Sequence, residues 1–169
     1  MNKRNMQGET NKMLIQKDTL VFPLPTEELF KRKEGFWRVS LPIDFVEFLK
    51  ENNGGIPVDG AFVCNNHEYI IDRFLCLLDV PKDNEFGIYD MDVTLAQLED
   101  RLTDNEELIS ADILPIAVLF AGDFLCLDFR ENREKPVVCV WNHEESSELD
   151  PETYFVANTF EEFLNLGKG

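Results

Sequence analysis

Basic side chains are scarce in this sequence. There are 16 Lys and Arg against 33 Asp and Glu, which gives a formal net charge of -17. Direct binding to nucleic acid or to an anionic membrane surface needs a cationic footprint, so the composition argues against both ligands and favours a basic partner. The charge is also uneven, because residues 1–50 carry a net charge of +2 and residues 51–169 a net charge of -19.

Long apolar runs and targeting signals are also absent. No segment approaches the roughly 18 apolar residues of a membrane span, and no apolar stretch of a secretory signal follows the polar start of the chain. The cysteines form no C-x-x-C pair, and each lies in an apolar stretch. We therefore expect a cytoplasmic protein with reduced core thiols. These cysteines are Cys64, Cys76, Cys126 and Cys139.

The 169 residues suit one domain of ordinary size. A hydrophobic content of 44% with 14 Phe supplies a core without disulfides or metal. We expect a flexible polar tail over residues 1–12 and a single domain over residues 13–169.

Two helices have clear signals in the first third of the chain. Thr26 can cap a short helix that runs through Glu34, with acids in its first turn where the helix dipole favours them. Pro42 suits the first position of a second helix, which Asn53-Gly54-Gly55 ends. One of these glycines, Gly54 by preference, should have a positive φ. A phosphate-binding role for this motif is disfavoured, because the C-terminal end of a helix dipole is negative.

The remaining chain alternates between further helical signals and β-rich runs. Thr94 can cap a helix to Arg101, and Thr159 with Glu162 forms a capping box for a final helix. Charged loops are expected over residues 81–90 and 143–152. Turn composition occurs at residues 65–68 and 121–123. The β-rich runs cover residues 61–64, 69–78, 114–120, 124–129 and 136–141. Without β-α-β alternation, this order predicts an α+β fold: a single mainly antiparallel sheet with helices packed on it.

Metal and catalytic motifs are weak. Cys64-x2-His67 and Cys139-x3-His143 are conceivable zinc half-sites, but neither spacing is usual for zinc. There is no G-x-S-x-G motif, and apolar surroundings make a thiol inert. We expect no metal, no cofactor and no enzymatic activity.

Closely spaced acidic residues are a further candidate for a metal site. Asp90-x-Asp92 and the acids of residues 144–150 have the chemistry to bind a divalent cation, yet a chain with 33 acids contains such pairs by chance. A solvated acidic face is the simpler interpretation. Asp128 lies inside an apolar run, where we expect it to face solvent or pair with a basic side chain. Trp141, at the end of a β-rich run, is either an interface anchor or a core residue, and the sequence leaves both open.

The order of these motifs resembles the SUKH superfamily of Smi1-like proteins. The resembling motifs are Leu41-Pro42-x-Asp44-Phe45-x2-Phe48-Leu49, Asn53-Gly54-Gly55, Leu114-Pro115-Ile116-Ala117, Gly122-Asp123, Leu125-x-Leu127-Asp128, Pro136-Val137-Val138, Trp141-x-His143 and Thr159-Phe160-x2-Phe163-Leu164. The resemblance covers residues 26–166, is least over residues 81–112, and implies an α+β fold without catalytic residues. The resemblance also implies structural roles for motif residues, namely Leu41, Pro42, Asn53, Gly54, Gly55, Gly122, Asp123 and Trp141.

The resemblance also implies a function. Bacterial members are mostly immunity proteins, and this chain is similar to antitoxins paired with LXG-type polymorphic toxins, whose C-terminal domain is often a ribonuclease. The alternative is a non-enzymatic scaffold or regulatory module of the same fold. An acidic inhibitor would complement the cationic groove of such a toxin. The residues predicted to contact the toxin are Trp141, Glu144, Glu145, Glu148 and Asp150, with the loop of Asp83, Glu85, Asp90 and Asp92 as the competing candidate.

Overall fold

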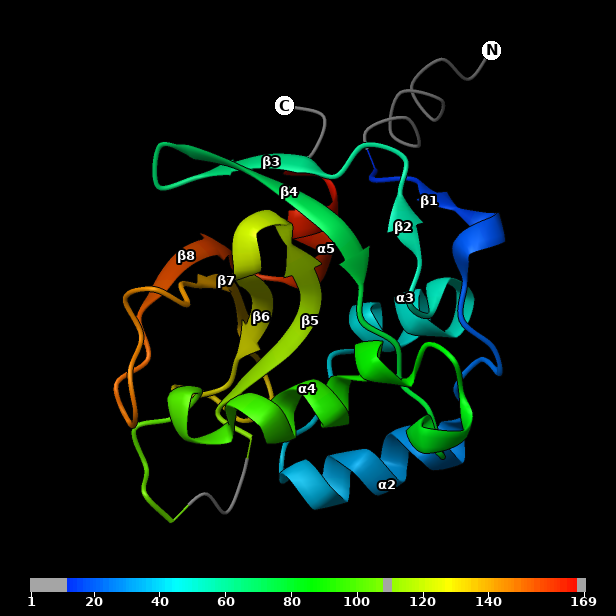
Figure 1. Ribbon diagram of the computed structural model, residues 1–169, viewed down its shortest axis with the longest axis horizontal. Coiled ribbons are helices and arrows are strands. Elements are labelled where there is room, and N and C mark those ends of the chain that lie inside the picture. Colours follow the sequence, from blue (N-terminus) through cyan, green and yellow to red (C-terminus); the bar gives the residue numbers. More distant parts are fainter. Residues whose placement is uncertain (1–11, 108–110, 167–169) are drawn as a thin grey trace.

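A six-stranded antiparallel sheet in the order β3-β4-β5-β6-β7-β8 forms the centre of the molecule (Figure 1). The computed structural model describes residues 12–107 and 111–166, so most of the predicted tail over residues 1–12 lies outside the described part. Two short strands, β1 (Ile15–Gln16) and β2 (Ile56–Pro57), pair separately. The strands of the main sheet are β3 (Ala61–Cys64), β4 (His67–Phe74), β5 (Ile113–Leu119), β6 (Phe124–Asp128), β7 (Val137–Trp141) and β8 (Thr153–Ala157).

The predicted α+β class is confirmed, and so are the two hairpin turns. Asn65 and Asn66 both have positive φ, at 53° and 64°, which a two-residue turn between twisted strands requires and Asn tolerates. The β5–β6 turn contains Ala121 and Gly122, with φ of 76° and 101°. Strand β8 is an addition to the predicted strands, and its residues Thr153–Ala157 are rich in β-forming types.

The first two helices begin where their caps predicted. In α2 (Glu27–Trp37) the Thr26 hydroxyl accepts a hydrogen bond from the Leu29 amide, but the helix continues to Trp37 rather than ending at Glu34. Helix α3 (Ile43–Asn52) has Pro42 as its N-cap rather than as its first helical residue. Gly54 has the predicted positive φ, at 68°.

Asn53 does more than end α3. Its buried side chain donates to the carbonyl of Val21 and accepts from the amide of Leu77, at 3.1 and 2.8 Å. It therefore joins the segment before α2 to the segment that follows β4.

The later helices include one correction. Helix α4 (Met91–Leu98) begins at Asp90, whose carboxylate caps it, so the prediction of Thr94 as the cap was wrong. Thr94 is instead a buried residue inside the helix. In α5 (Phe160–Leu164) the Thr159 hydroxyl accepts from the Glu162 amide, as predicted.

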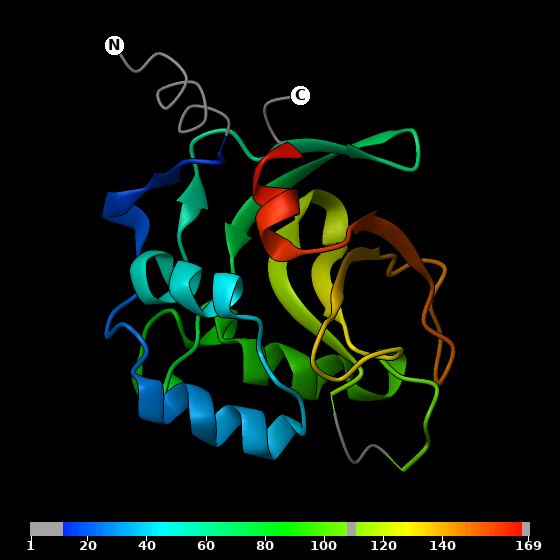
Figure 2. The ribbon, with the colours of Figure 1, turned by 180° about the vertical axis from the view of Figure 1, so that it is seen from behind.

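The helices cover both faces of the sheet. Helices α3 and α5 lie together on the face seen in Figure 2, where Phe160 packs edge-on against Phe45 and Phe48. Helix α4 lies on the opposite face, beside β5, with α2 next to it (Figure 1). Beneath α4 a second small core contains Leu102, Ile113, Cys126, Cys139 and Trp141.

All four cysteines are free and buried, as predicted. Asp128 also meets its expectation, because its carboxylate pairs with Arg130 at 2.8 Å. Within the described ranges, no helix combines the length and apolar character needed to cross a membrane.

Candidate functional site

Two acidic segments that are distant in the sequence lie side by side at one end of α4. The first, residues 99–107, contains the short 3-10 helix η4 (Glu99–Arg101), and the second is the loop of residues 143–152 (Figure 1). The amide of Leu149 donates to the carbonyl of Asp100 at 2.6 Å. The guanidinium of Arg101 donates to the carbonyls of His143 and Ser146. Main-chain acceptors thus hold the two segments together.

Trp141 is buried at this junction and contacts Arg101. Its Nε1 donates to the carbonyl of Arg101 at 3.0 Å, and the Arg101 guanidinium lies 5.0 Å from the centre of the indole ring. Trp141 is only 1% exposed. The prediction that it anchors a partner directly was therefore wrong, because a buried indole with a satisfied N–H has no surface to offer.

The acidic side chains around this junction face solvent. We call them the acidic edge. Arg101 is the only Lys or Arg of the two segments, and it is directed inward onto main-chain carbonyls and Trp141. No acid of the edge belongs to an ion pair within the described part of the chain. The acidic edge comprises Glu99, Asp100, Asp104, Glu106, Glu107, Glu144, Glu145, Glu148, Asp150 and Glu152, all exposed.

Four of the predicted contact residues thus lie on one continuous surface. Glu144, Glu145, Glu148 and Asp150 are exposed, as a steering role requires. The acids of residues 99–107 were not among the predicted contact residues. Their spacing along the chain was visible, but only the tertiary contacts reveal that they extend the loop of residues 143–152.

The competing acidic loop lies at the other end of α4 (Figure 1). Asp83 and Glu85 are exposed there. Asp90 is fully buried, and its carboxylate accepts hydrogen bonds from three main-chain amides, so its prediction as a contact residue was wrong. Burial raises the pKa of Asp90, against the opposing effect of these amides. Asp92 pairs with Lys33 at 2.7 Å, which leaves Asp83 and Glu85 as the exposed carboxylates of the predicted second surface.

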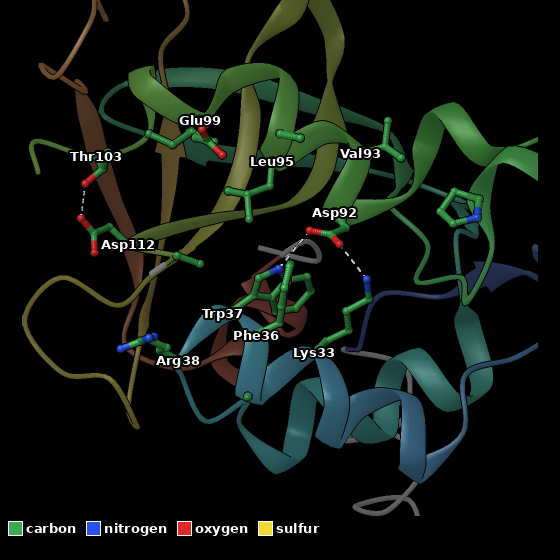
Figure 3. Close-up of a pocket in the computed structure, with 15 residues that line it drawn as sticks. Lys33, Phe36, Trp37, Arg38, Asp92, Val93, Leu95, Glu99, Thr103 and Asp112 are labelled. Atoms are coloured by element: carbon green, nitrogen blue, oxygen red, sulfur yellow. Dashed lines mark hydrogen bonds and ion pairs between the residues drawn. The ribbon is translucent and has the colours of Figure 1, made fainter. Parts of the chain in front are cut away.

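A groove of about 700 Å³ separates α2 from α4 (Figure 3). The carboxylate of Asp92 lies at its centre, where it accepts from the Trp37 indole and from Lys33. Phe36 is 74% exposed beside it. The central charges of this groove, Lys33 and Asp92, pair with each other and connect the two helices, whereas Arg38 and Glu99 line it without an ion-pair partner among the described residues.

A second cavity, of about 340 Å³, lies beside β4, and we call it the β4 pocket. It adjoins the acidic edge, because Glu145 belongs to both. The hydroxyl of Tyr154 donates to Glu145, and this hydrogen bond raises the pKa of Tyr154 to about 12. The lining residues are Asn65, His67, Glu68, Tyr69, Ile70, Phe120, Ala121, Asp123, Asn142, Glu145 and Tyr154.

The two conceivable zinc half-sites do not assemble into a metal site in the described residues. No group of three His, Cys, Asp or Glu there has a geometry suited to a metal ion. Burial raises the pKa of the Cys64 and Cys139 thiols. His143 instead contacts Asp123, whose carboxylate lies 2.6 Å from its Nδ1 and also accepts from its amide. Gly122 keeps this arrangement open, since a Cβ there would lie 3.1 Å from the imidazole ring.

The chain that forms this fold matches a known family. The family model described as SMI1-KNR4 cell-wall (SUKH_6) matches residues 27–164, from the start of α2 to the end of α5. The chain belongs to this family, whose domains generally bind partner proteins and are often immunity proteins.

The chain is also similar to a prophage protein. The SPbeta prophage-derived uncharacterized protein YokK of Bacillus subtilis strain 168 is 28% identical over 149 residues, which cover 82% of this chain and 72% of the relative.

Proposed function

We propose that this protein is a non-enzymatic immunity protein that binds a cognate toxin domain in the cytosol and blocks its active site. The observation that carries the proposal is the acidic edge. Two acidic segments join there, and their one Arg is used internally. A surface of this kind attracts a strongly basic partner and repels nucleic acid.

The charge of the acidic edge also points to a chemical class of toxin. A ribonuclease domain binds an anionic polymer, so its groove is cationic and complements the acidic edge. We therefore propose a nuclease toxin, in particular the C-terminal ribonuclease domain of an LXG-type toxin. The prophage origin given in the name of the similar Bacillus subtilis protein is consistent with this role, because mobile elements often carry toxin and immunity genes together.

Neutralisation of a neighbouring toxin tests the proposal. The genes adjacent to this one would be searched for a toxin, and the C-terminal domain of such a toxin would be expressed in a bacterial host with and without this protein. We expect growth arrest by the toxin alone, growth with both proteins, and a stoichiometric complex on size-exclusion chromatography. The purified protein should also abolish ribonuclease activity of that domain at equimolar amounts.

The scaffold alternative gives a different result. A protein that neither binds nor neutralises the toxin of a neighbouring gene would contradict the immunity function. The same result would favour a regulatory binding module of this fold.

A further inference from the structure

We propose that the β4 pocket receives an arginine side chain of the partner protein. The inference rests on the proposed function, because it assumes a basic partner, and it names the chemistry of the central contact. The acidic edge would attract that partner over a distance, whereas the β4 pocket would hold one of its cationic groups.

The shape of the pocket follows from a mismatch in strand length. β4 pairs with β5 only from Ile71 onward, so residues 67–70 are paired on their β3 side alone. The turn that contains Phe120 packs beside this part of β4. Glu145, from the loop after β7, and Tyr154, from β8, complete the lining. At about 340 Å³, the cavity is at the small end of ligand pockets and suits one long side chain.

The charge of the pocket is negative and not neutralised by Lys or Arg. Glu68, Asp123 and Glu145 line it, and His67 is the one lining residue with a basic side chain. None of the three carboxylates has a Lys or Arg partner among the described residues, and the one ion pair among them joins Asp123 to His143. A cation that enters the pocket would therefore meet two carboxylates without an ion-pair partner among the described residues, those of Glu68 and Glu145, of which Glu145 already accepts from the Tyr154 hydroxyl.

Tyr69 lines the pocket together with these carboxylates. Burial, and after it the neighbouring acidic groups that include Asp123 and Glu145, raises the pKa of Tyr69. The α2–α4 groove differs in this respect, because its central carboxylate, Asp92, already holds Lys33. The larger groove also has Lys33 and Arg38 in its lining, whereas the β4 pocket is lined by three acids and no Lys or Arg, so its charge favours a cation more strongly.

Aromatic walls favour a guanidinium over an ammonium ion. Tyr69, Phe120 and Tyr154 line the pocket, and Phe120 is 68% exposed. A planar guanidinium can stack on an aromatic face and donate two parallel hydrogen bonds to a carboxylate, whereas an ammonium ion acts as a point charge. Glu145 offers such a carboxylate beside Tyr154. The combination points to arginine.

The experiment titrates the isotopically labelled protein with N-acetyl-arginine amide and follows its amide resonances by NMR. We expect saturable shifts at residues lining the pocket, with a dissociation constant in the millimolar range. N-acetyl-lysine amide should bind more weakly. N-acetyl-citrulline amide, which has nearly the same shape without the charge, should not bind.

Two variants and one matched control make the test specific. Glu145→Gln preserves an acceptor for the Tyr154 hydroxyl, and we expect it to weaken binding of the arginine probe about tenfold, the loss typical of one charge-assisted hydrogen bond. Phe120→Ala removes an exposed wall and should weaken binding a few-fold. Glu148→Gln makes the same charge change on the same loop outside the pocket, and it should leave binding unchanged.

The outcomes separate the pocket from the proposed function. Absence of saturable shifts at the pocket, equal binding of the citrulline probe, or equal effects of Glu145→Gln and Glu148→Gln would each overturn the arginine site, even if wild-type protein neutralises the toxin. Specific probe binding without toxin binding would instead overturn the immunity function and support the pocket chemistry.

Discussion

The Trp141 indole and Arg101 contact each other twice: Nε1 of Trp141 donates to the Arg101 carbonyl, and the Arg101 guanidinium lies over the indole ring. The same guanidinium donates to the carbonyls of His143 and Ser146. A buried aromatic residue and an inward-directed cation therefore position two acidic segments. The shape of the acidic edge depends on this pair, although neither residue offers a negative charge.

Replacement of Trp141 should primarily affect stability. We expect Trp141→Ala to lower the free energy of unfolding by about 3–5 kcal/mol, because it leaves a cavity in a close-packed core. Urea unfolding followed by circular dichroism measures this change. Phe36→Ala, at an aromatic residue that is 74% exposed, is the control and should change stability by less than about 0.5 kcal/mol. Normal stability with lost toxin binding would show that Trp141 is a contact residue after all.

Two glycines should respond oppositely to alanine. Gly54 has a φ of 68°, and a Cβ there would lie 2.6 Å from Cγ2 of Val21. We expect Gly54→Ala to destabilise the fold by about 2–4 kcal/mol through backbone strain and overpacking.

Gly35 provides the matched control. It lies within α2, and beyond its own helix backbone a Cβ at this position would meet no atom within 4 Å, so Gly35→Ala should stabilise by about 0.5–1 kcal/mol. Thermal and urea denaturation of both variants check this pair. Equal effects at the two sites would contradict the assignment of Gly54 as a strained, closely packed position.

Asp90 should be essential to the start of α4. Its Oδ1 accepts from the amides of Asp92 and Val93, and its Oδ2 accepts from the amide of Leu78. In Asp90→Asn the side-chain NH2 group, a donor, faces one of these donating amides, so a buried hydrogen bond is lost. We expect the unfolding free energy to fall by about 1–3 kcal/mol. Asp83→Asn, at an exposed acid of the same loop, should have almost no effect.

The difference in unfolding free energy between the wild type and Asp90→Asn should change with pH in one direction. Because burial raises the pKa of Asp90 above its unfolded value, the folded protein binds more protons at this group between the two pKa values. The contribution of Asp90 to stability therefore falls as pH rises through this window. The stability advantage of the wild type over Asp90→Asn should shrink from about pH 4 upward and then level off above the folded pKa. An advantage that grows with pH would contradict the raised pKa.

Charge reversal on the acidic edge should slow association with the toxin. We expect Glu148→Lys with Asp150→Lys to lower the association rate constant about tenfold at low salt and to reduce its salt dependence, because exposed charges steer diffusional encounter. Asp83→Lys with Glu85→Lys makes the same charge change at the other end of α4 and should have a smaller effect. Stopped-flow measurements across a salt series distinguish the two surfaces. A larger effect of the second pair would move the interface to the competing loop.

The thiols should be unreactive in the folded protein. Burial raises the pKa of Cys76 to about 12 and raises the pKa of Cys126 as well. We expect Ellman's reagent at about pH 8 to label none of the four cysteines rapidly in native protein, and all four after guanidinium denaturation. Rapid labelling of one native thiol would identify an accessible, reactive cysteine.

Local signals predicted much of the secondary structure. The Thr26 cap, the Asn65-Asn66 turn and the Thr159 cap each act through atoms within a few residues, so the sequence alone specifies them. The start of α4 was misplaced because Asp90 and Thr94 are both good N-caps. The Asp90 carboxylate also accepts a hydrogen bond from the amide of Leu78. This contact between distant residues favours Asp90 as the cap, and the local sequence does not reveal it. β8 was missed although its residues favour a strand.

The candidate site also has features that the sequence predicts and features that only the fold reveals. The Thr26 and Thr159 caps, the hairpin turns, the buried thiols and the concentration of negative charge after residue 50 could be predicted from the chain alone, because each depends on composition or on neighbours along the chain. The internal position of Trp141, and the union of residues 99–107 and 143–152 in one edge, became visible in the folded molecule. Those facts depend on contacts such as that between Trp141 and Arg101, 40 positions apart, which no local pattern encodes.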